Sequence, residues 1–273
     1  MQEQYEGFCH NLLPGATFET PDEIGSNRAR HLGAMMVGHF TEALQSPVAF
    51  AKKVTRFRPH SIQAHMLDIA AKKERVLILN APGTGASTAG AIFAMHRIMA
   101  RRNHRVLIIS PGRGMLNQCA EILNSNSFET IDAKQLFSIR TESGYWANEL
   151  AEWGVHWSHF ADLPVHHIPD VIRDEHTILV DNAHQYSPEF LLLLQAAIQP
   201  HQQLIVIGRD TNRMLQKFEN DPEFSTVRAR IDQTPLVTAG FVNMKRELYR
   251  DHPDEYEQIF QMPISWVPVK CPA

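Results

Sequence analysis

The stretch Arg75-Val-Leu-Ile-Leu-Asn-Ala-Pro-Gly-Thr-Gly-Ala-Ser-Thr88 decides the fold. Residues 76–79 form a continuous apolar run, as expected for a parallel strand that is covered on both faces. Gly83 and Gly85 then interrupt the run, and small residues from Ala86 onward begin a helix. The stretch therefore predicts a buried strand, a tight glycine turn and a helix in immediate succession.

This turn follows the phosphate-binding pattern G-x-x-x-x-G-K-[ST] incompletely. In that pattern the glycines let backbone N–H groups converge on phosphate, the lysine reaches the β- and γ-phosphates, and the hydroxyl serves Mg²⁺. Here Ala86 stands where lysine belongs, and Asn80 stands at the first glycine. We expect ATP and Mg²⁺ as ligands, with Ser87 or Thr88 supplying the hydroxyl. The residues predicted to hold the nucleotide phosphates are Gly83, Thr84, Gly85, Ala86, Ser87 and Thr88.

Composition limits the classes of protein to which the chain could belong. Its 273 residues are 44% apolar, which suffices for one sizeable α/β core. A net charge of −4 argues against a surface coated in basic charge. The three cysteines are far apart, which disfavours a zinc site or a disulfide framework and indicates a reducing environment. With no signal peptide or long apolar run, we expect a soluble, cytoplasmic protein that does not bind membranes.

Strand-like and helix-like segments alternate along the chain, which predicts a parallel sheet with right-handed crossovers. Strands are expected at residues 76–79, 105–111, 176–184, 203–210 and 236–242, and residues 134–140 are compatible with another. Helices are expected at residues 31–44, 48–54, 64–73, 89–100, 115–123, 190–198, 244–250 and 254–260. Trp146, Trp153 and Trp157 fit one helical stripe, which favours core packing over a base-stacking platform.

A carboxylate ends the third strong strand. Asp181 follows residues 177–180, and a carboxylate at the carboxyl end of a parallel strand beside a phosphate loop is suited to hold Mg²⁺. Ser87 and Asp181 are thus the predicted metal ligands. The next residue, where a glutamate would activate water, is Asn182, whose amide cannot accept a proton at neutral pH. Glu189, further along the chain, is a candidate substitute for this base, although nothing in the sequence directs its carboxylate to the site.

Two other polar segments are candidates for the site. Gln63 has the donor and acceptor groups that adenine requires, although a helix-capping role is equally compatible with its position. Residues 209–212, Arg-Asp-Thr-Asn, follow a strand and suit a γ-phosphate sensor, though polar strand ends are common without a role. His156, His159, His166 and His167 lack a sustained metal-ligand spacing, so no zinc is expected.

Taken together, these motifs resemble the ATPase domain of a phage or viral large terminase subunit, the motor that packages DNA into a procapsid. The similarity covers residues 46–265. Ser46–Val54 and Arg58–Gln63 are similar to the adenine-binding entry, Ala81–Thr88 to the Walker A loop, and Thr177–Gln185 to the Walker B strand. The resemblance implies a three-layer RecA-like P-loop NTPase fold, with a mainly parallel central sheet and helices on both faces.

The resemblance also implies a domain plan. Residues 1–45 form an N-terminal arm and helix, residues 46–262 the ATPase-type domain, and residues 263–273 a tail, with no nuclease domain. Residues 81–85 and the Asp-x-Ala-His quartet that begins at Asp181 are also similar to superfamily-two helicase motifs, but such a helicase needs a second RecA-like domain. Terminases often have an arginine within the Walker A loop, and residues 80–88 contain none.

The degenerate positions leave the activity open. One hypothesis is a packaging ATPase that binds ATP and Mg²⁺ and is impaired in hydrolysis by Ala86 and Asn182. The alternative is a non-catalytic terminase-like assembly or regulatory protein; the helicase-like fragment is a second alternative. The partners that the resemblance implies are double-stranded DNA, other terminase subunits or an active motor, and the portal or procapsid, with a homo-oligomer as a further possibility. A viral protein would act in the host cytoplasm.

Overall fold

The structure is a computed structural model that describes residues 41–101, 104–124, 138–140, 145–147, 154–159, 161, 163–235 and 237–261. At its centre is an eight-stranded sheet in the order β3-β4-β5-β2-β6-β7-β1-β8. The strands are β1 (Arg75–Asn80), β2 (Arg105–Ser110), β3 (Ser138–Arg140), β4 (Tyr145–Ala147), β5 (Gly154–His159), β6 (Thr177–Val180), β7 (Gln203–Gly208) and β8 (Ser225–Ala229). In the part of the sheet ordered β5-β2-β6-β7-β1-β8, neighbouring strands pair in parallel. At the other edge, β3 pairs antiparallel with β4, and β4 pairs antiparallel with β5.

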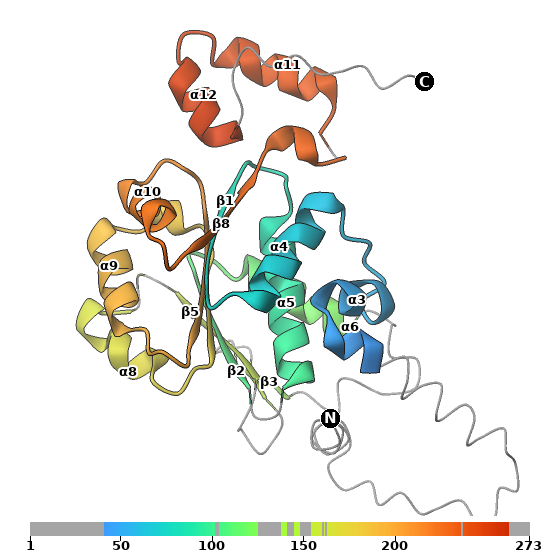
Figure 1. Cartoon of the computed structure of the whole chain (residues 1–273), viewed down its shortest axis with the longest axis vertical. Coiled ribbons are helices and arrows are strands. Elements are labelled where there is room, and N and C mark those ends of the chain that lie inside the picture. Colours follow the sequence, from blue (N-terminus) through green and yellow to red (C-terminus); the bar gives the residue numbers. More distant parts are fainter. Residues whose placement is uncertain are drawn as a thin grey trace, which may run out of the picture.

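Helices cover both faces of the sheet, so the fold has three layers (Figure 1). One layer contains α3 (Pro47–Lys53), α4 (Ser61–Lys72), α5 (Ala86–Ala100) and α6 (Gly114–Asn124). The opposite layer contains α8 (Ile168–Ile172), α9 (Pro188–Ala197) and α10 (Arg213–Asn220). The pair α11 (Ala239–Leu248) and α12 (Pro253–Phe260) lies beyond the ends of β1 and β8. Short 3₁₀ turns occur at η2 (Val165–His167), η3 (Ala183–Gln185) and η4 (Ile231–Gln233).

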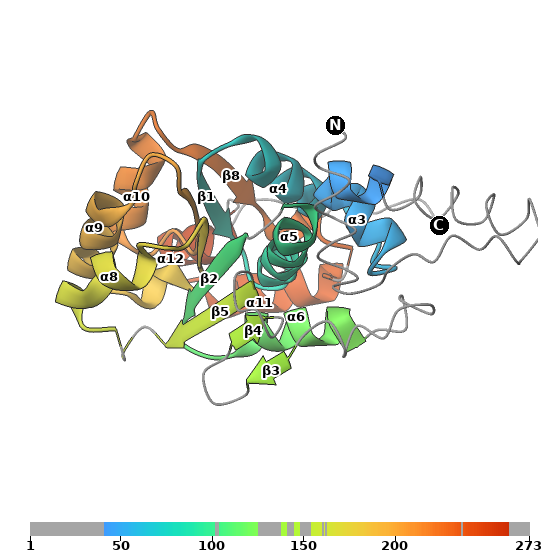
Figure 2. The same cartoon turned by 90° about the horizontal axis from the view of Figure 1, so that it is seen from below.

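Alternation along the strands distributes the apolar side chains of the sheet between two clusters, one on each face. On β7, Ile205 and Ile207 join the cluster formed with α4 and α5, whereas Leu204 and Val206 join the one formed with α9 and α10. Strands that are apolar on both faces are the expected result of burial between two helical layers. The view in Figure 2 shows the sheet between these layers, with β3 and β4 at the edge remote from β8. The predicted three-layer, mainly parallel architecture is confirmed.

Local sequence signals explain where several helices begin. Ser46 caps α3 by accepting the Val48 N–H at 3.2 Å, and Pro47 occupies the first helical position. Ser187 caps α9 in the same way through the Phe190 N–H at 3.2 Å. The strands predicted before the phosphate loop and at residues 105–111, 176–184 and 203–210 are all present, with boundaries within a few residues.

The predicted strand at residues 236–242 is wrong. Helix α11 begins at Ala239 instead, because the Thr238 hydroxyl accepts the Phe241 N–H at 3.2 Å and caps the helix. The strand that completes this end of the sheet is β8, which pairs with β1 and was not predicted. Its sequence, Ser-Thr-Val-Arg-Ala, is too short and polar to give a strong apolar signal.

The predicted helical stripe of tryptophans is also wrong. Trp146 lies in β4 and Trp157 in β5, and β4 pairs antiparallel with β5 so that Trp146 lies opposite Val155. The indole of Trp157 does pack partly against the core. Trp153 lies outside the described residues. Also outside the described residues are residues 1–40, residues 134–137 and the tail at 263–273. Of the segment around the helix expected at residues 31–44, the structure describes residues 41–45, which are helical.

Candidate phosphate-binding site

The loop between β1 and α5 has the backbone geometry of a tight glycine turn. Gly83 and Gly85 both have positive φ, at 81° and 72°, in the left-handed region that glycine adopts without steric cost. The buried Thr84 hydroxyl donates to the Ala81 carbonyl at 2.8 Å, which closes the turn from within. No side chain caps the first turn of α5, which starts at Ala86. A loop followed by an uncapped helix N-terminus directs free N–H groups at a bound anion.

Ser87 and Asp181 meet beside this loop. The Ser87 hydroxyl donates to Asp181 Oδ1 at 3.1 Å, and the Asn182 backbone N–H donates to the same oxygen at 3.0 Å. Burial raises the pKa of the Asp181 carboxyl, and these hydrogen bonds oppose that shift. The ionised carboxylate is thus costly here, so a cation at this position would favour its charged form. Hydroxyl and carboxylate oxygens are the ligands that suit Mg²⁺.

Tyr186 holds the backbone next to the Ser87–Asp181 pair in place. Its phenol oxygen lies 2.7 Å from the Asp181 carbonyl oxygen and 3.2 Å from that of Ile109, which ties the end of β6 to the end of β2. Asn212 in turn donates to the Tyr186 carbonyl at 2.9 Å. Burial raises the pKa of the Tyr186 hydroxyl, which keeps it neutral. Sequence reasoning missed Tyr186, because one tyrosine after a strand gives no pattern to recognise.

Gln63 contacts the phosphate loop directly. Its amide nitrogen donates to the Gly85 carbonyl at 3.3 Å, and its amide oxygen accepts the His60 N–H at 3.3 Å, which caps α4. The side chain is buried, at 4% exposed. The structure therefore places Gln63 at the predicted loop but engages both of its amide groups with backbone. Contact with adenine stays a prediction.

The two degenerate positions lie in the centre of the site. Ala86 is buried as the first residue of α5, where a lysine would begin its reach toward phosphate. Asn182 follows Asp181 with φ 55°, in the left-handed region, and its N–H faces the carboxylate. Glu189 is exposed in the first turn of α9. Thr88, the other candidate hydroxyl, makes no hydrogen bond through its side chain to any described residue, so the geometry favours Ser87.

In the predicted γ-phosphate sensor segment, residues 209–212, two residues contact other parts of the protein and one has no partner among the described residues. Asp210 forms an ion pair with Arg228 at 3.0 Å. Asn212 caps α10 by accepting the Met214 N–H at 2.8 Å. Arg209 is half-buried, and its guanidinium makes no hydrogen bond or ion pair with any residue that the structure describes. Beside it, burial and then Arg209 itself lower the pKa of His184 to about 4.

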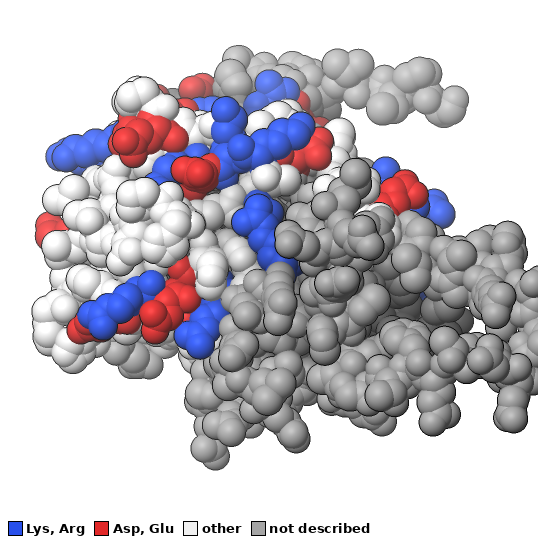
Figure 3. All heavy atoms as spheres, turned by 60° about the horizontal axis from the view of Figure 1, so that its bottom comes forward, with Lys and Arg blue, Asp and Glu red and all other residues white. Residues whose placement is uncertain are grey.

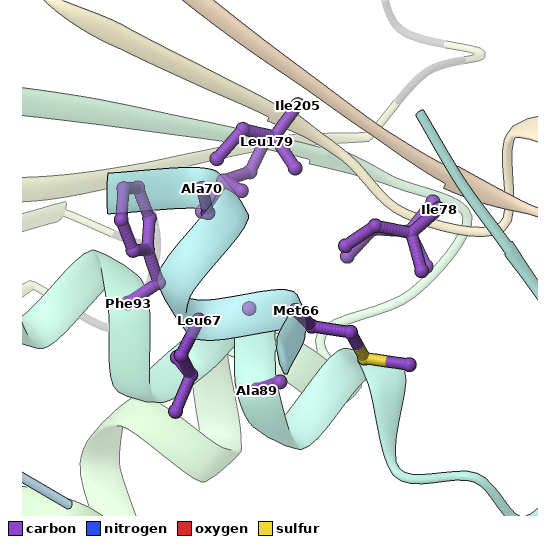
Figure 4. Close-up of a pocket in the computed structure, with 10 residues that line it drawn as sticks. Met66, Leu67, Ala70, Ile78, Ala89, Phe93, Leu179 and Ile205 are labelled. Carbon is purple, nitrogen blue, oxygen red and sulfur yellow. The ribbon is translucent and has the colours of Figure 1, made fainter. Parts of the chain in front are cut away.

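A cavity elsewhere in the molecule is a packing defect rather than a ligand site. It lies between α4, α5 and the sheet, and its lining is apolar, including Met66, Phe93 and Ile205 (Figure 4). Its volume of about 10 Å³ is at the lower limit for holding one water molecule, and an apolar space of this size stays dry. The described ranges contain no group of His, Cys, Asp and Glu placed to hold a metal ion, and no helix in them could cross a membrane.

Comparisons with known proteins identify the fold. No protein-family model and no curated protein matches the sequence. The large terminase ATPase domain of Thermus phage P74-26 is similar in structure, with TM-score 0.51 and 14% identity over 80% of this chain and 99% of that one. The large terminase of bacteriophage HK97 gives 0.52 and 12% over 80% of this chain and 54% of its own.

A third similar structure is a large terminase from a thermophilic bacteriophage, solved in complex with ADP. Its TM-score is 0.50, with 9% identity over 76% of this chain and 53% of that one. Identities this low demonstrate shared architecture rather than shared activity. The chain has the three-layer α/β RecA-like fold of phage large-terminase ATPase domains.

Proposed function

We propose that this chain is a terminase-type packaging motor domain that binds ATP and Mg²⁺ at residues 81–88 and couples to translocation of viral DNA. The observation that carries the proposal is the 3.1 Å contact between Ser87 and Asp181, which joins the helix after the glycine loop to the end of β6. One residue is a hydroxyl of the glycine loop and the other a strand-end carboxylate, and together they offer the kinds of oxygen ligand that a nucleotide-bound Mg²⁺ takes, which supports the proposal.

The residues present fit a phosphate group and Mg²⁺. The glycine loop and the uncapped start of α5 would bind phosphate through backbone N–H groups, and Ser87 and Asp181 would hold the metal. When bound, Mg²⁺ would neutralise charge on the phosphates. Gln63 would contact adenine only by giving up one of its present backbone hydrogen bonds. The ADP complex of a similar large terminase supports a nucleotide as the ligand class.

ATP hydrolysis is the step of the proposed function that we expect to be impaired, because two residues that it requires are replaced in this sequence. Ala86 removes the lysine charge that stabilises the transferring phosphate, and Asn182 replaces the carboxylate that orients or deprotonates water. Glu189 is exposed on α9 and offers no positioned replacement. We therefore propose nucleotide binding with impaired turnover.

These same two residues favour a second candidate function. A terminase-like protein that keeps the fold without turnover would act as an assembly or regulatory component beside an active motor. Its partners would be other terminase subunits, the portal or procapsid, or further copies of this chain. If the chain is a packaging motor, double-stranded DNA is its proposed substrate. On the face in Figure 3, basic and acidic side chains of the described residues are interspersed, so DNA contact there would rely on a local patch.

A DNA-stimulated phosphate-release assay tests the proposal. The unmodified chain should bind ATP with little turnover, whereas the double variant Ala86→Lys, Asn182→Glu should gain turnover because both missing groups are restored. Rapid ATP turnover by the unmodified chain would reject the non-catalytic alternative. If neither protein releases phosphate, the result would count against the packaging-motor function. Binding itself can be followed by melting temperature, since ATP at 100 times its dissociation constant adds about 2.7 kcal/mol of stability.

A further inference from the structure

Tyr186 reaches back to the end of the strand that precedes it. After β6 the chain turns through Asn182, which has φ 55°, and through the short turn η3. This turn brings the Tyr186 hydroxyl to 2.7 Å from the Asp181 carbonyl oxygen and 3.2 Å from that of Ile109. A phenol has one proton, so the shorter contact, with Asp181, is the stronger hydrogen bond. The side chain is buried and its ring packs on Phe190 with centroids 5.3 Å apart, which fixes the position of the hydroxyl.

A single peptide group connects that hydroxyl to the Asp181 carboxylate. The Asp181 carbonyl, which accepts from Tyr186, and the Asn182 N–H belong to the same peptide bond. The Asn182 N–H donates to Asp181 Oδ1 at 3.0 Å, and the same oxygen accepts the Ser87 hydroxyl. Because a peptide bond is planar, its carbonyl and its N–H rotate together. The Tyr186 hydrogen bond therefore fixes the direction of the N–H that holds the carboxylate.

The orientation of this peptide is strained. Asn182 has φ 55° and ψ 38°, in the left-handed region that residues other than glycine adopt at a cost. Rotation of the peptide between Asp181 and Asn182 would relieve the strain, but it would turn the carbonyl away from Tyr186 and the N–H away from Oδ1. A strained residue persists only where its surroundings hold it in place. The buried Tyr186 hydroxyl supplies such a restraint.

We infer that Tyr186 is a positioning residue, whose hydroxyl locks the Asp181–Asn182 peptide in the orientation in which the Asp181 carboxylate serves Mg²⁺. The inference rests on the proposed function and deepens it, because it assigns to Tyr186 the geometry of one of the proposed metal ligands. Tyr186 acts through the peptide group and supplies no metal ligand itself. Removing a group that orients a metal ligand typically lowers metal affinity about 10- to 100-fold.

Titration calorimetry on the full chain tests this role. The probe is a non-hydrolysable ATP analogue, titrated once with Mg²⁺ and once with EDTA. Tyr186→Phe should weaken binding with Mg²⁺ about tenfold, as expected when the group behind a metal ligand is lost, and should leave binding in EDTA unchanged. A role in stability alone would change the two affinities equally. Tyr256→Phe is the matched control, because its phenol is also buried but its hydroxyl has no hydrogen-bond partner among the described residues, so neither affinity should change.

Amide hydrogen exchange, measured by NMR without nucleotide, gives a second readout. The Asn182 N–H should exchange faster in Tyr186→Phe than in Tyr256→Phe, because the peptide is then free to rotate away from Oδ1. The amide of Leu77, in the buried part of β1, should exchange at the same rate in both variants. Equal exchange of the Asn182 N–H in the two variants would overturn the inference whatever the nucleotide does.

The calorimetric outcomes separate the inference from the proposed function. Unchanged binding with Mg²⁺ in Tyr186→Phe, or an equal loss with Mg²⁺ and with EDTA, would overturn the inference and leave the proposed function standing. If the unmodified chain binds the analogue under neither condition, the proposed function fails and the inference fails with it. Should Tyr186→Phe not fold, Asn182→Gly is compared with the double variant Asn182→Gly, Tyr186→Phe, because glycine adopts positive φ without strain. The double variant should bind more weakly with Mg²⁺ only, and an equal Mg²⁺ effect in the two would overturn the inference.

Discussion

The amide nitrogen of Gln63 lies 3.3 Å from the carbonyl oxygen of Gly85, which packs the start of α4 directly onto the phosphate loop. A Cβ at Gly85 would lie 2.1 Å from that nitrogen, and its φ of 72° disfavours any other residue. Gly85→Ala should therefore lower the free energy of unfolding by at least about 1–2 kcal/mol, the cost of a left-handed alanine. Urea denaturation measures this. Gly112→Ala is the control, since a Cβ there meets nothing within 4 Å; equal midpoints for the two variants would contradict the prediction.

Ser87→Ala should abolish the Mg²⁺ dependence of nucleotide binding. The substitution removes the hydroxyl that donates to Asp181 and that we assign to the metal. It should also cost about 1–2 kcal/mol of stability, because the buried carboxylate loses a hydrogen bond. The measurement is the nucleotide-induced rise in melting temperature with Mg²⁺ and with EDTA. Thr88→Ala is the matched control and should behave like the unmodified chain, so loss of the Mg²⁺ effect in Thr88→Ala alone would reverse the assignment.

Buried His104 should make the protein acid-sensitive. It lies 3.0 Å from the Thr177 hydroxyl, and burial, followed by nearby His176, lowers its pKa to about 3. The unfolded chain, with a histidine pKa near 6.5, therefore binds the proton more readily than the folded one. Stability attributable to neutral His104 is complete above about pH 6.5 and declines as the pH falls toward about 3, with a loss of about 2 kcal/mol at pH 5.

Urea midpoints measured from pH 7 to pH 5 test this dependence. His104→Gln should flatten the decline, because glutamine does not titrate and can still hydrogen-bond to the Thr177 hydroxyl. His65→Gln changes an exposed histidine on α4 and should leave the slope as it is in the unmodified chain. A slope unaffected by His104→Gln would mean that other groups cause the acid sensitivity.

Arg228 should hold the α11–α12 pair against the sheet. From β8 it donates to Glu219 at 2.7 Å, to Asp210 at 3.0 Å and to Gln261, just past α12, at 2.6 Å. Arg228→Gln should increase amide hydrogen exchange in residues 253–260 and cost about 1 kcal/mol, a figure kept small because the arginine is partly solvated. Arg230→Gln removes a local pair with Asp232 and serves as the control. Equal exchange in both variants would exclude a role for Arg228 in holding α12.

The predictable parts of the fold are those in which one physical signal dominates. β1, β2, β6 and β7 are buried on both faces, so their continuous apolar runs mark them without knowledge of their neighbours. β8 was not predicted from the sequence, because an edge strand needs apolar residues on only part of its length. The mistaken strand at residues 236–242 shows that a cap can outweigh an apolar pattern, since Thr238 converts the second half of that segment into α11.

The site was predictable as a set of residue types but not as a set of contacts. Asp181 and Ser87 could be named because each follows a recognisable turn or strand end. The pairing of Gln63 with Gly85, and of Tyr186 with two strand-end carbonyls, depends on how separate elements pack. That Arg209 makes no hydrogen bond or ion pair with any described residue likewise depends on which side chains surround it in space, which the order of residues in the chain does not contain.

The position of β1 in the sheet has a consequence for the newly made chain. Its partners are β7 and β8, whose residues lie at 203–208 and 225–229. At usual translation speeds, β1 leaves the ribosome on the order of ten seconds before its first partner is synthesised. During that interval the apolar strand that leads into the phosphate loop has no strand to pair with. The nascent protein therefore passes through a stage in which the apolar residues of β1 lack their native strand partners and are open to aggregation.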